Sequence, residues 1–294
     1  MSADFPGDAL LQWASNQRQD LPWRQTRDPW AVLVAELMLQ QTQVARVAPR
    51  WHQFLERFPT IAACAQQSVS AVIEEWAGLG YNRRAVNLHR CAQVVCAEHD
   101  GKLPTDIDAL MSLPGIGPYT ARAIAAFAYE QDVAVVDTNV GRVLARFFAR
   151  KFSARAAQVQ ADEIVPHGKG WAWNQGMLDV GAVCCVKRNP RCEICPLQTQ
   201  CEWNQQGKPL PDPAEGSAGV SKKQSAFHGS FRQGRARMLD ELRKGMTLLP
   251  QDLVTACGWQ EQPDGIEQAQ RAADSLVKDG LAATTAQGHY VLAN

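Results

Sequence analysis

The sequence predicts an all-α protein that ends in a small unit with a β-hairpin. Over residues 8–205, apolar residues recur at steps of three and four, as in helices with one buried face. Glycine and proline interrupt this pattern repeatedly, and strand-like alternation is scarce. The chain has 294 residues, of which 46% are hydrophobic, so it can form two or three domains with cores of their own.

Composition excludes several protein classes. No stretch of 18 uninterrupted apolar residues is present, so we expect no membrane span and no membrane partner. The first residues, MSADFPGDALLQW, lack the basic region and long apolar core of a secretory signal. We therefore expect a cytoplasmic protein with reduced thiols.

The net charge of zero conceals an uneven distribution. Residues 182–245 carry eleven Lys/Arg and six Asp/Glu, a net charge of +5, whereas residues 246–294 carry two and six, a net charge of −4. A basic region of this kind can meet a phosphate backbone although the whole chain is neutral.

The composition changes after the helical region. Residues 206–225 are rich in proline, glycine, serine and charge, which predicts a linker. Residues 226–294 then predict three helices (235–245, 250–258 and 266–280) and two short strands joined by a turn at Gly288. This order is typical of a winged-helix-like module, which binds DNA or protein. The acidic balance of residues 246–294 favours protein contact or self-packing.

A cluster of cysteines predicts a metal centre. Five of the nine cysteines lie between positions 184 and 201. Structural zinc sites more often pair two knuckles across a longer loop, whereas one compact loop with four thiolates suits an iron–sulfur cluster of the 4Fe-4S type. A zinc knuckle and unligated thiols are the alternatives. The predicted ligands, with Cys184 as the spare thiol, have the spacing C-x6-C-x2-C-x5-C and are Cys185, Cys192, Cys195 and Cys201.

Basic residues accompany this loop. Lys187, Arg188 and Arg191 lie between the first two predicted ligands. They form either an ordinary solvated loop or a surface that contacts phosphates.

Two isolated carboxylates stand in apolar surroundings. Glu36 is the one charge in AVLVAELMLQQTQVA, and burial would raise its pKa and suit it to proton donation. A surface glutamate on an amphipathic helix is the alternative. Asp137, followed by Asn139, is isolated in VAVVDTNVGRV and also fits a helix N-cap. A proton donor and an ionised carboxylate together can cleave a glycosidic bond.

Residues 113–124, LPGIGPYTARAI, predict two helices joined by a tight hairpin. Gly115 and Gly117 let the backbone approach a phosphate, and the helix that starts near Thr120 attracts it. A plain interhelical turn is the alternative.

Together these segments resemble the MutY-type adenine DNA glycosylases of the helix-hairpin-helix, iron–sulfur superfamily. The matching strings cover about 200 residues in the family's order: LPWR (21–24), ELMLQQTQV (36–44), GLGY (78–81), the hairpin, VVDTNVGRVLAR (135–146), WNQGMLDVGAVC (173–184) and the cysteine loop. The resemblance implies a six-helix domain with the hairpin at 24–129, and an iron–sulfur helical domain at 1–23 and 130–205. It also implies a bacterial, nucleoid-associated enzyme that acts as a monomer on duplex DNA with A:8-oxoguanine or A:G mispairs.

The resemblance implies roles for individual residues. Glu36 protonates the flipped-out adenine, Asp137 stabilises the sugar cation with support from Asn139, and Tyr119 lies beside the sugar. The remaining expected contacts are an adenine pocket of Trp23, Arg24 and Gln175, wedge residues Gln41 and Tyr81, and further DNA-binding residues Thr42, Gly115, Gly117 and Thr120.

Tyr119 predicts the reaction type. Endonuclease III-like relatives have a lysine there that forms a Schiff base, and tyrosine cannot form one. We therefore expect a monofunctional glycosylase. A G:T-mismatch thymine glycosylase can also have this tyrosine, although the QQTQV string argues against it. A DNA-binding protein that has lost catalysis is the other alternative.

The tail departs from the family pattern. Many members end in a larger β-rich domain that checks for 8-oxoguanine, but here about 70 residues follow the linker. No Phe-Ser-His loop is present, and the nearest string, AFHGSF (226–231), is not equivalent. Short tails of this kind look similar to those of actinobacterial relatives.

Overall fold

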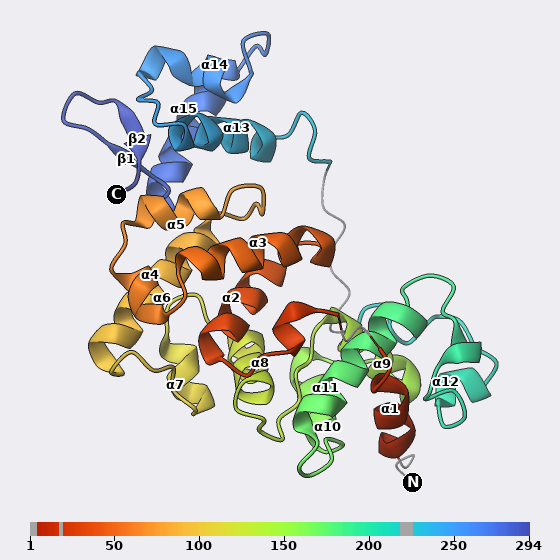
Figure 1. The fold of residues 1–294 in the computed structure, drawn as a ribbon. Helices are drawn as coiled ribbons and strands as arrows, with labels where there is room; N and C mark the ends of the chain where they lie inside the picture. The colour runs from red at the N-terminus through yellow and green to blue at the C-terminus, as the bar shows by residue number, and fades with distance from the viewer. Residues whose placement is uncertain (1–4, 18–19, 218–225) are drawn as a thin grey trace. The chain divides into compact units, whose positions relative to one another are not determined.

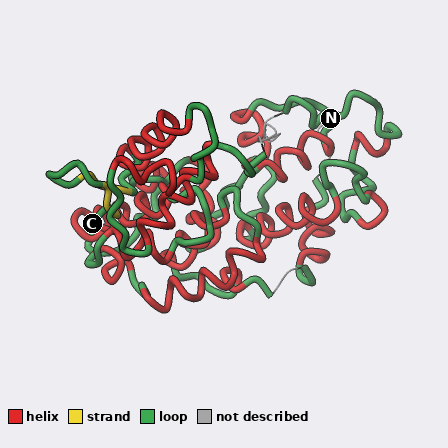
Figure 2. Tube along the Cα trace, turned by 90° about the horizontal axis from the view of Figure 1, so that it is seen from above, coloured by secondary structure: helices red, strands yellow, loops and turns green. Residues whose placement is uncertain are grey.

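A computed structural model describes residues 5–17, 20–217 and 226–294 (Figure 1). The second part of the predicted linker, residues 218–225, lies outside this range. Helices dominate, and the strands of the described residues are confined to the C-terminal region (Figure 2). The predicted all-α class is confirmed. No described helix has the length and apolar character needed to cross a membrane.

The chain folds into two compact units. Unit 1 draws on Met1–Leu33, Thr105–Met111 and Ile116–Lys222, and unit 2 on Val34–Pro104, Ser112–Gly115 and Lys223–Asn294. The helix α2 (Pro29–Leu39) begins in unit 1 and continues in unit 2, and α7 (Ile107–Ser112) lies mainly in unit 1.

Unit 1 contains most of the predicted chemistry. Its other elements are α1 (Gly7–Ala14), η1 (Pro22–Arg24), α8 (Pro118–Phe127), α9 (Thr138–Phe147), α10 (Ala154–Asp162), α11 (Gly170–Asp179), η2 (Val180–Cys184), η3 (Cys192–Ile194) and α12 (Glu202–Gln205). The element η2 is a π-helix that continues α11 towards the cysteine loop.

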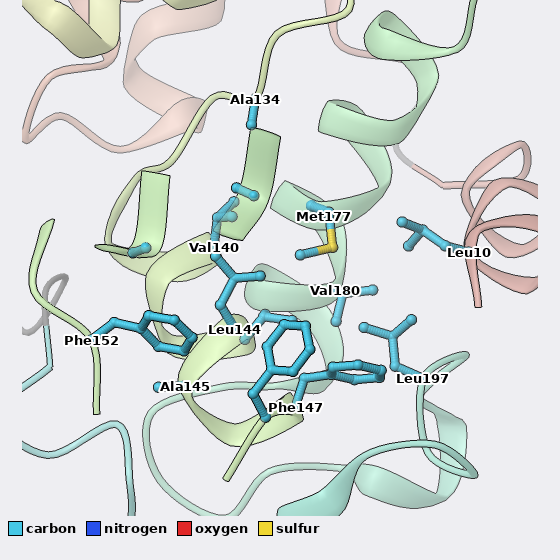
Figure 3. Close-up of a cluster of buried hydrophobic side chains, with 14 of the residues drawn as sticks. Leu10, Ala134, Val140, Leu144, Ala145, Phe147, Phe152, Met177, Val180 and Leu197 are labelled. Carbon is cyan, nitrogen blue, oxygen red and sulfur yellow. The ribbon is translucent and has the colours of Figure 1, made fainter. Parts of the chain in front are cut away.

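The core of unit 1 fixes α9 against α11 and η2. Val140 and Leu144 of α9 face Met177 and Val180, and Phe147 extends the same buried face (Figure 3). All five side chains are at most 2% exposed. Their burial stabilises the site because α9 begins at Asp137 and η2 ends beside the cysteines.

Besides the end of α2, unit 2 combines four helices with the C-terminal segment, residues 226–294. The elements are α3 (Val44–Arg57), α4 (Ile61–Ala65), α5 (Val69–Glu75), α6 (Arg83–Glu98), α13 (Phe231–Arg243), η4 (Pro250–Asp252), α14 (Leu253–Cys257), α15 (Gly265–Lys278), β1 (Ala282–Thr284) and β2 (Tyr290–Leu292). Thr60, Ser68 and Ser230 start α4, α5 and α13 by accepting a hydrogen bond from the first helical turn.

The C-terminal segment has the predicted three helices and hairpin. The strands β1 and β2 pair antiparallel, with Ala283 opposite Val291, and Leu248 forms an isolated bridge to Tyr290. The three helices pack against one another, and α13 also contacts α5. The C-terminal segment therefore belongs to the same compact unit as residues 34–104.

Candidate functional site

Glu36 lies in the buried part of α2. It is the one charged residue of PWAVLVAELML, and 7% of its surface is exposed. Its neighbours Val34, Leu37 and Met38 are at most 1% exposed. The alternative of an exposed glutamate on an amphipathic helix is therefore wrong, and Glu36 is buried, as its predicted role requires.

Arg84, which the sequence analysis did not identify, fixes the C-terminal end of α2 through hydrogen bonds to its carbonyl groups. Arg84 is 7% exposed, and its guanidinium lies near the ring of Tyr81, with 5.6 Å between the Arg84 Cζ and the ring centroid. It donates hydrogen bonds of 2.5–3.3 Å to the carbonyl oxygens of Leu37, Met38, Gln40, Leu79, Gly80 and Tyr81 and to the hydroxyl of Thr42. Burial lowers the pKa of Arg84 to about 10, so it stays charged at neutral pH.

Through Arg84 the structure brings the predicted wedge loops together. The Thr42 hydroxyl also donates to the Leu79 carbonyl at 3.3 Å. Gln41 and Tyr81 have left-handed backbone conformations, with φ of 56° and 46°. Such conformations cost about 1–3 kcal/mol outside glycine and gather at functional sites. Both residues are exposed, Tyr81 by 43%.

Asp137 is the N-cap of α9, as the sequence suggested. Its Oδ1 accepts from the backbone N–H groups of Asn139 (2.8 Å) and Val140 (2.7 Å), and its Oδ2 accepts from the Asn139 side-chain amide at 2.8 Å. These three donors fix the carboxylate, and the helix N-terminus favours its negative charge. The structure thus brings Asp137 and Asn139 into direct contact.

Arg142 connects this pair to the cysteine loop. Its Nη2 donates to the side-chain oxygen of Asn139 at 2.8 Å and to the Gly181 carbonyl at 2.7 Å, and its Nε donates to the Cys185 carbonyl at 2.6 Å. Gly181 permits this approach, because a Cβ at that position would lie 2.6 Å from the Asn139 Cβ. The carboxylate and the loop are therefore linked through successive hydrogen bonds.

The predicted adenine-pocket residues are joined by a buried ion pair. Arg24 donates to both carboxylate oxygens of Asp179 at 2.8 Å, and Asp179 is fully buried. Asp179 lies one turn after Gln175 on α11, and Arg24 directly follows Trp23 in η1. This pair holds the backbone that carries Trp23 close to the helix that carries Gln175. Gln175 is buried and Trp23 is half-buried.

The two glycines of the hairpin differ. Gly115 has φ of 80°, and a Cβ there would lie 2.6 Å from the Asn87 Cβ, so both conformation and packing require glycine. Gly117 has an extended backbone and open space above it, and it precedes the first residue of α8. Within α8, Tyr119 is half-buried and Thr120 is buried.

The predicted metal ligands line one pocket. Besides the four ligands, the pocket is lined by Cys184 and by Arg146, Gln198, Trp203 and Asn204. Within the described ranges, no three Cys, His, Asp or Glu side chains converge closely enough to hold a single metal ion. Four thiols that line one pocket provide the number of protein ligands that a 4Fe-4S cluster takes. The residues present therefore fit a 4Fe-4S cluster.

Arg146 borders this pocket and holds a part of the predicted linker. It is 2% exposed, lies 3.4 Å from the Cys185 Sγ and forms an ion pair of 2.6 Å with Asp212. Burial raises the pKa of the Cys185 thiol, and the charge of Arg146 opposes this shift. Ser217 is also buried and donates to the Pro213 carbonyl, so the first half of the predicted linker packs on unit 1. The basic residues Lys187, Arg188 and Arg191 are exposed, as either interpretation requires.

The residues that sequence reasoning missed share a partial signal. Arg142 and Arg146 are one turn apart in the apolar segment VGRVLAR, and Asp179 interrupts the apolar end of α11. A charge in an apolar helix predicts a buried partner. The partner itself could not be predicted, because it lies far away in the chain.

Comparisons with known proteins agree with these observations. Residues 34–166 match the HhH-GPD superfamily of base excision DNA repair proteins. The adenine DNA glycosylase of Mycolicibacterium smegmatis is 40% identical, over 97% of this chain and 94% of that protein. The Mycobacterium tuberculosis H37Rv adenine DNA glycosylase is also 40% identical, over 96% and 92%. A solved thermostable thymine-DNA glycosylase aligns with 30% identity and a TM-score of 0.65, covering 68% of this chain and 95% of that one.

Proposed function

The chain belongs to the adenine DNA glycosylase family of the HhH-GPD superfamily, and we propose that it excises adenine paired with 8-oxoguanine or guanine in duplex DNA. The burial of Glu36, the one charge of α2, carries this proposal. We place the enzyme in the bacterial cytoplasm, at the nucleoid, as a monomer.

Glu36 acts as the general acid. Adenine leaves poorly as an anion, so protonation of its imidazole ring weakens the glycosidic bond. Burial keeps the Glu36 carboxyl group away from bulk water. Arg84 holds the carbonyl groups of the next two residues, Leu37 and Met38, which fixes the backbone beside the acid.

Asp137 stabilises the positive charge that develops on the sugar. Its three N–H donors hold the carboxylate in one orientation, and Asn139 contributes two of them. A charge that is already oriented needs no reorganisation when the sugar cation forms. Tyr119 lies beside the sugar and cannot form a Schiff base, so the strand is left uncut.

Adenine must leave the base stack before it can react. Opening the stack costs a few kcal/mol, roughly, and side chains inserted into the gap offset part of this cost. The exposed Gln41 and Tyr81 serve as these wedges. Trp23, Arg24 and Gln175 form the pocket that receives adenine, and the hairpin with Gly117 binds backbone phosphates.

The four cysteines Cys185, Cys192, Cys195 and Cys201 would hold a 4Fe-4S cluster. Such a cluster supplies structural cross-linking of the loop. The loop then presents Lys187, Arg188 and Arg191 to DNA phosphates.

The test is single-turnover excision of adenine by Glu36→Gln, compared with Glu56→Gln, which makes the same charge change on an exposed site of α3. We expect Glu36→Gln to abolish excision but to bind the duplex nearly as well as the unchanged protein does. Glu56→Gln should excise adenine at the normal rate. Excision at the normal rate by Glu36→Gln would refute the assignment of the acid.

A second candidate is thymine excision from G:T mispairs, favoured by the 30% identity to the thymine-DNA glycosylase. Duplexes with A:8-oxoguanine, A:G and T:G assayed side by side separate the two functions. We expect excision from the first two and none of thymine.

A further inference from the structure

The last residue of α13 reaches the loop that carries Tyr81. The Nη2 of Arg243 donates to the side-chain oxygen of Asn82, the residue after Tyr81, at 2.8 Å. Its Nε donates to the Ile73 carbonyl at 3.1 Å, and its Nη1 donates to Asp240 at 2.9 Å. A guanidinium from the C-terminal segment is therefore hydrogen-bonded directly beside the predicted wedge.

This contact is largely removed from solvent. The Arg243 side chain is 10% exposed, whereas its partner on the same helix, Asp240, is 59% exposed. Burial lowers the pKa of Arg243, and the hydrogen bond and charge of Asp240 oppose this shift. A buried charge is costly unless its donors are satisfied, and two of the three acceptors of Arg243 belong to the part of unit 2 that carries the wedge.

The C-terminal segment contacts the helix after the wedge at a second place. Asp279, which follows α15, lies 3.7 Å from the guanidinium of Arg83, in the first turn of α6. The next residue, Gly280, lies so close to α6 that a Cβ there would be 3.4 Å from Val86. The start of α6 is thus held by α13 and by the end of α15.

Tyr81 is exposed and has an unfavourable backbone conformation, so it needs contacts that hold its loop in place. Tyr81 is 43% exposed with φ of 46°, a conformation that an unsupported loop would leave. Arg84 fixes the Tyr81 carbonyl. That hydrogen bond does not restrain the side chain of Asn82, which accepts a hydrogen bond from Arg243 instead.

We propose that Arg243 is a positioning residue for Tyr81. Through the hydrogen bond of Arg243 to Asn82, the C-terminal segment holds Tyr81 in place while the base stack is opened. This inference rests on the proposed function of Tyr81. The C-terminal segment would thereby assist opening of the DNA at the lesion, through its contact with the loop that carries Tyr81.

The experiment is a double-mutant cycle in the full chain. Single-turnover adenine excision from an A:8-oxoguanine duplex is measured for Tyr81→Ala, Arg243→Gln and the double variant. Arg237→Gln is the matched control, because Arg237 is an exposed residue of the same helix. We expect Arg243→Gln to slow excision about tenfold, the order of loss for a charge-assisted hydrogen bond, and Arg237→Gln to cut normally.

The cycle separates positioning from general destabilisation. If Arg243 acts through the wedge, the double variant is no slower than Tyr81→Ala alone. Excision of adenine opposite an abasic analogue, where unstacking costs less, should be nearly unaffected by Arg243→Gln. Asn82→Ala, which leaves the bond of Arg243 to the Ile73 carbonyl, should reproduce the defect if the tail stays docked.

The outcomes also separate this inference from the proposed function. Additive losses in the double variant, or equal losses on both duplexes, would overturn the positioning role. Normal excision by Arg243→Gln together with a slow Tyr81→Ala would also overturn it and leave the proposed wedge intact. Normal excision by Tyr81→Ala would refute the wedge itself.

Discussion

Replacing Arg84 by methionine should strongly destabilise unit 2. Methionine fills a similar space without donors, so six carbonyl oxygens and one hydroxyl lose a hydrogen bond. The carbonyls of Leu37, Met38 and Gln40 lie at the C-terminal end of α2, where helical carbonyls have no donor within the helix. Three of these carbonyls have another donor: the Thr42 hydroxyl can donate to Leu79 or Gln40, and the backbone N–H of residue 84 donates to Tyr81.

The magnitude follows from these acceptors. Each buried carbonyl left without a donor costs about 1–3 kcal/mol. Water can reach those on the exposed loops, and removal of Arg84 also ends the cost of burying its charge. We therefore expect the free energy of unfolding to fall by about 3–5 kcal/mol, a large part of the roughly 5–15 kcal/mol typical of a domain.

The assay is urea denaturation combined with hydrogen–deuterium exchange. Exchange should rise first in residues 37–42 and 78–82, since these segments lose their shared donor. Arg90→Met is the control, because Arg90 is exposed on the same helix. A loss below about 1 kcal/mol, with unchanged exchange in both segments, would refute the reasoning.

Three further predictions concern unit 1. Arg142→Gln should slow adenine excision at least about tenfold while iron and sulfide analysis shows normal cluster content, because the cysteines stay in place and the support of the catalytic carboxylate is lost. Asp179→Asn should lower the free energy of unfolding by about 3–5 kcal/mol, measured by urea denaturation, because Arg24 keeps a buried charge without its counterion. Burial opposes ionisation of Asp212, but the hydrogen bonds and charge of Arg146, the backbone N–H of Ala214 and the charge of Arg142 together hold the pKa of Asp212 below its usual range. The pair therefore stabilises the protein above the ordinary aspartate pKa, and limited proteolysis of residues 206–217 should increase as pH falls through the lowered value; Asp212→Asn should show this increase at neutral pH.

Local sequence patterns predicted the helix cap at Asp137, the cysteine site and the helices of the C-terminal segment. Asp137 was predicted as an N-cap from its place before an apolar helix, and the structure has the cap. The cysteines could be assigned to one site because eighteen residues hold five of them. The helices of the C-terminal segment followed from their apolar periodicity. Each of these signals lies within a few residues of the feature that it predicts.

By itself, the sequence determined the helical class, the family and the candidate chemistry, because periodicity, capping and motif spacing are local properties of a chain. Only the tertiary structure decided that Glu36 is buried rather than exposed on its helix, that Arg84 joins two loops, and that Arg243 reaches Asn82. Arg84 and Arg243 bind mainly backbone carbonyls and residues distant in sequence. A carbonyl has the same chemistry at every position, so no pattern of residue types could have identified those contacts.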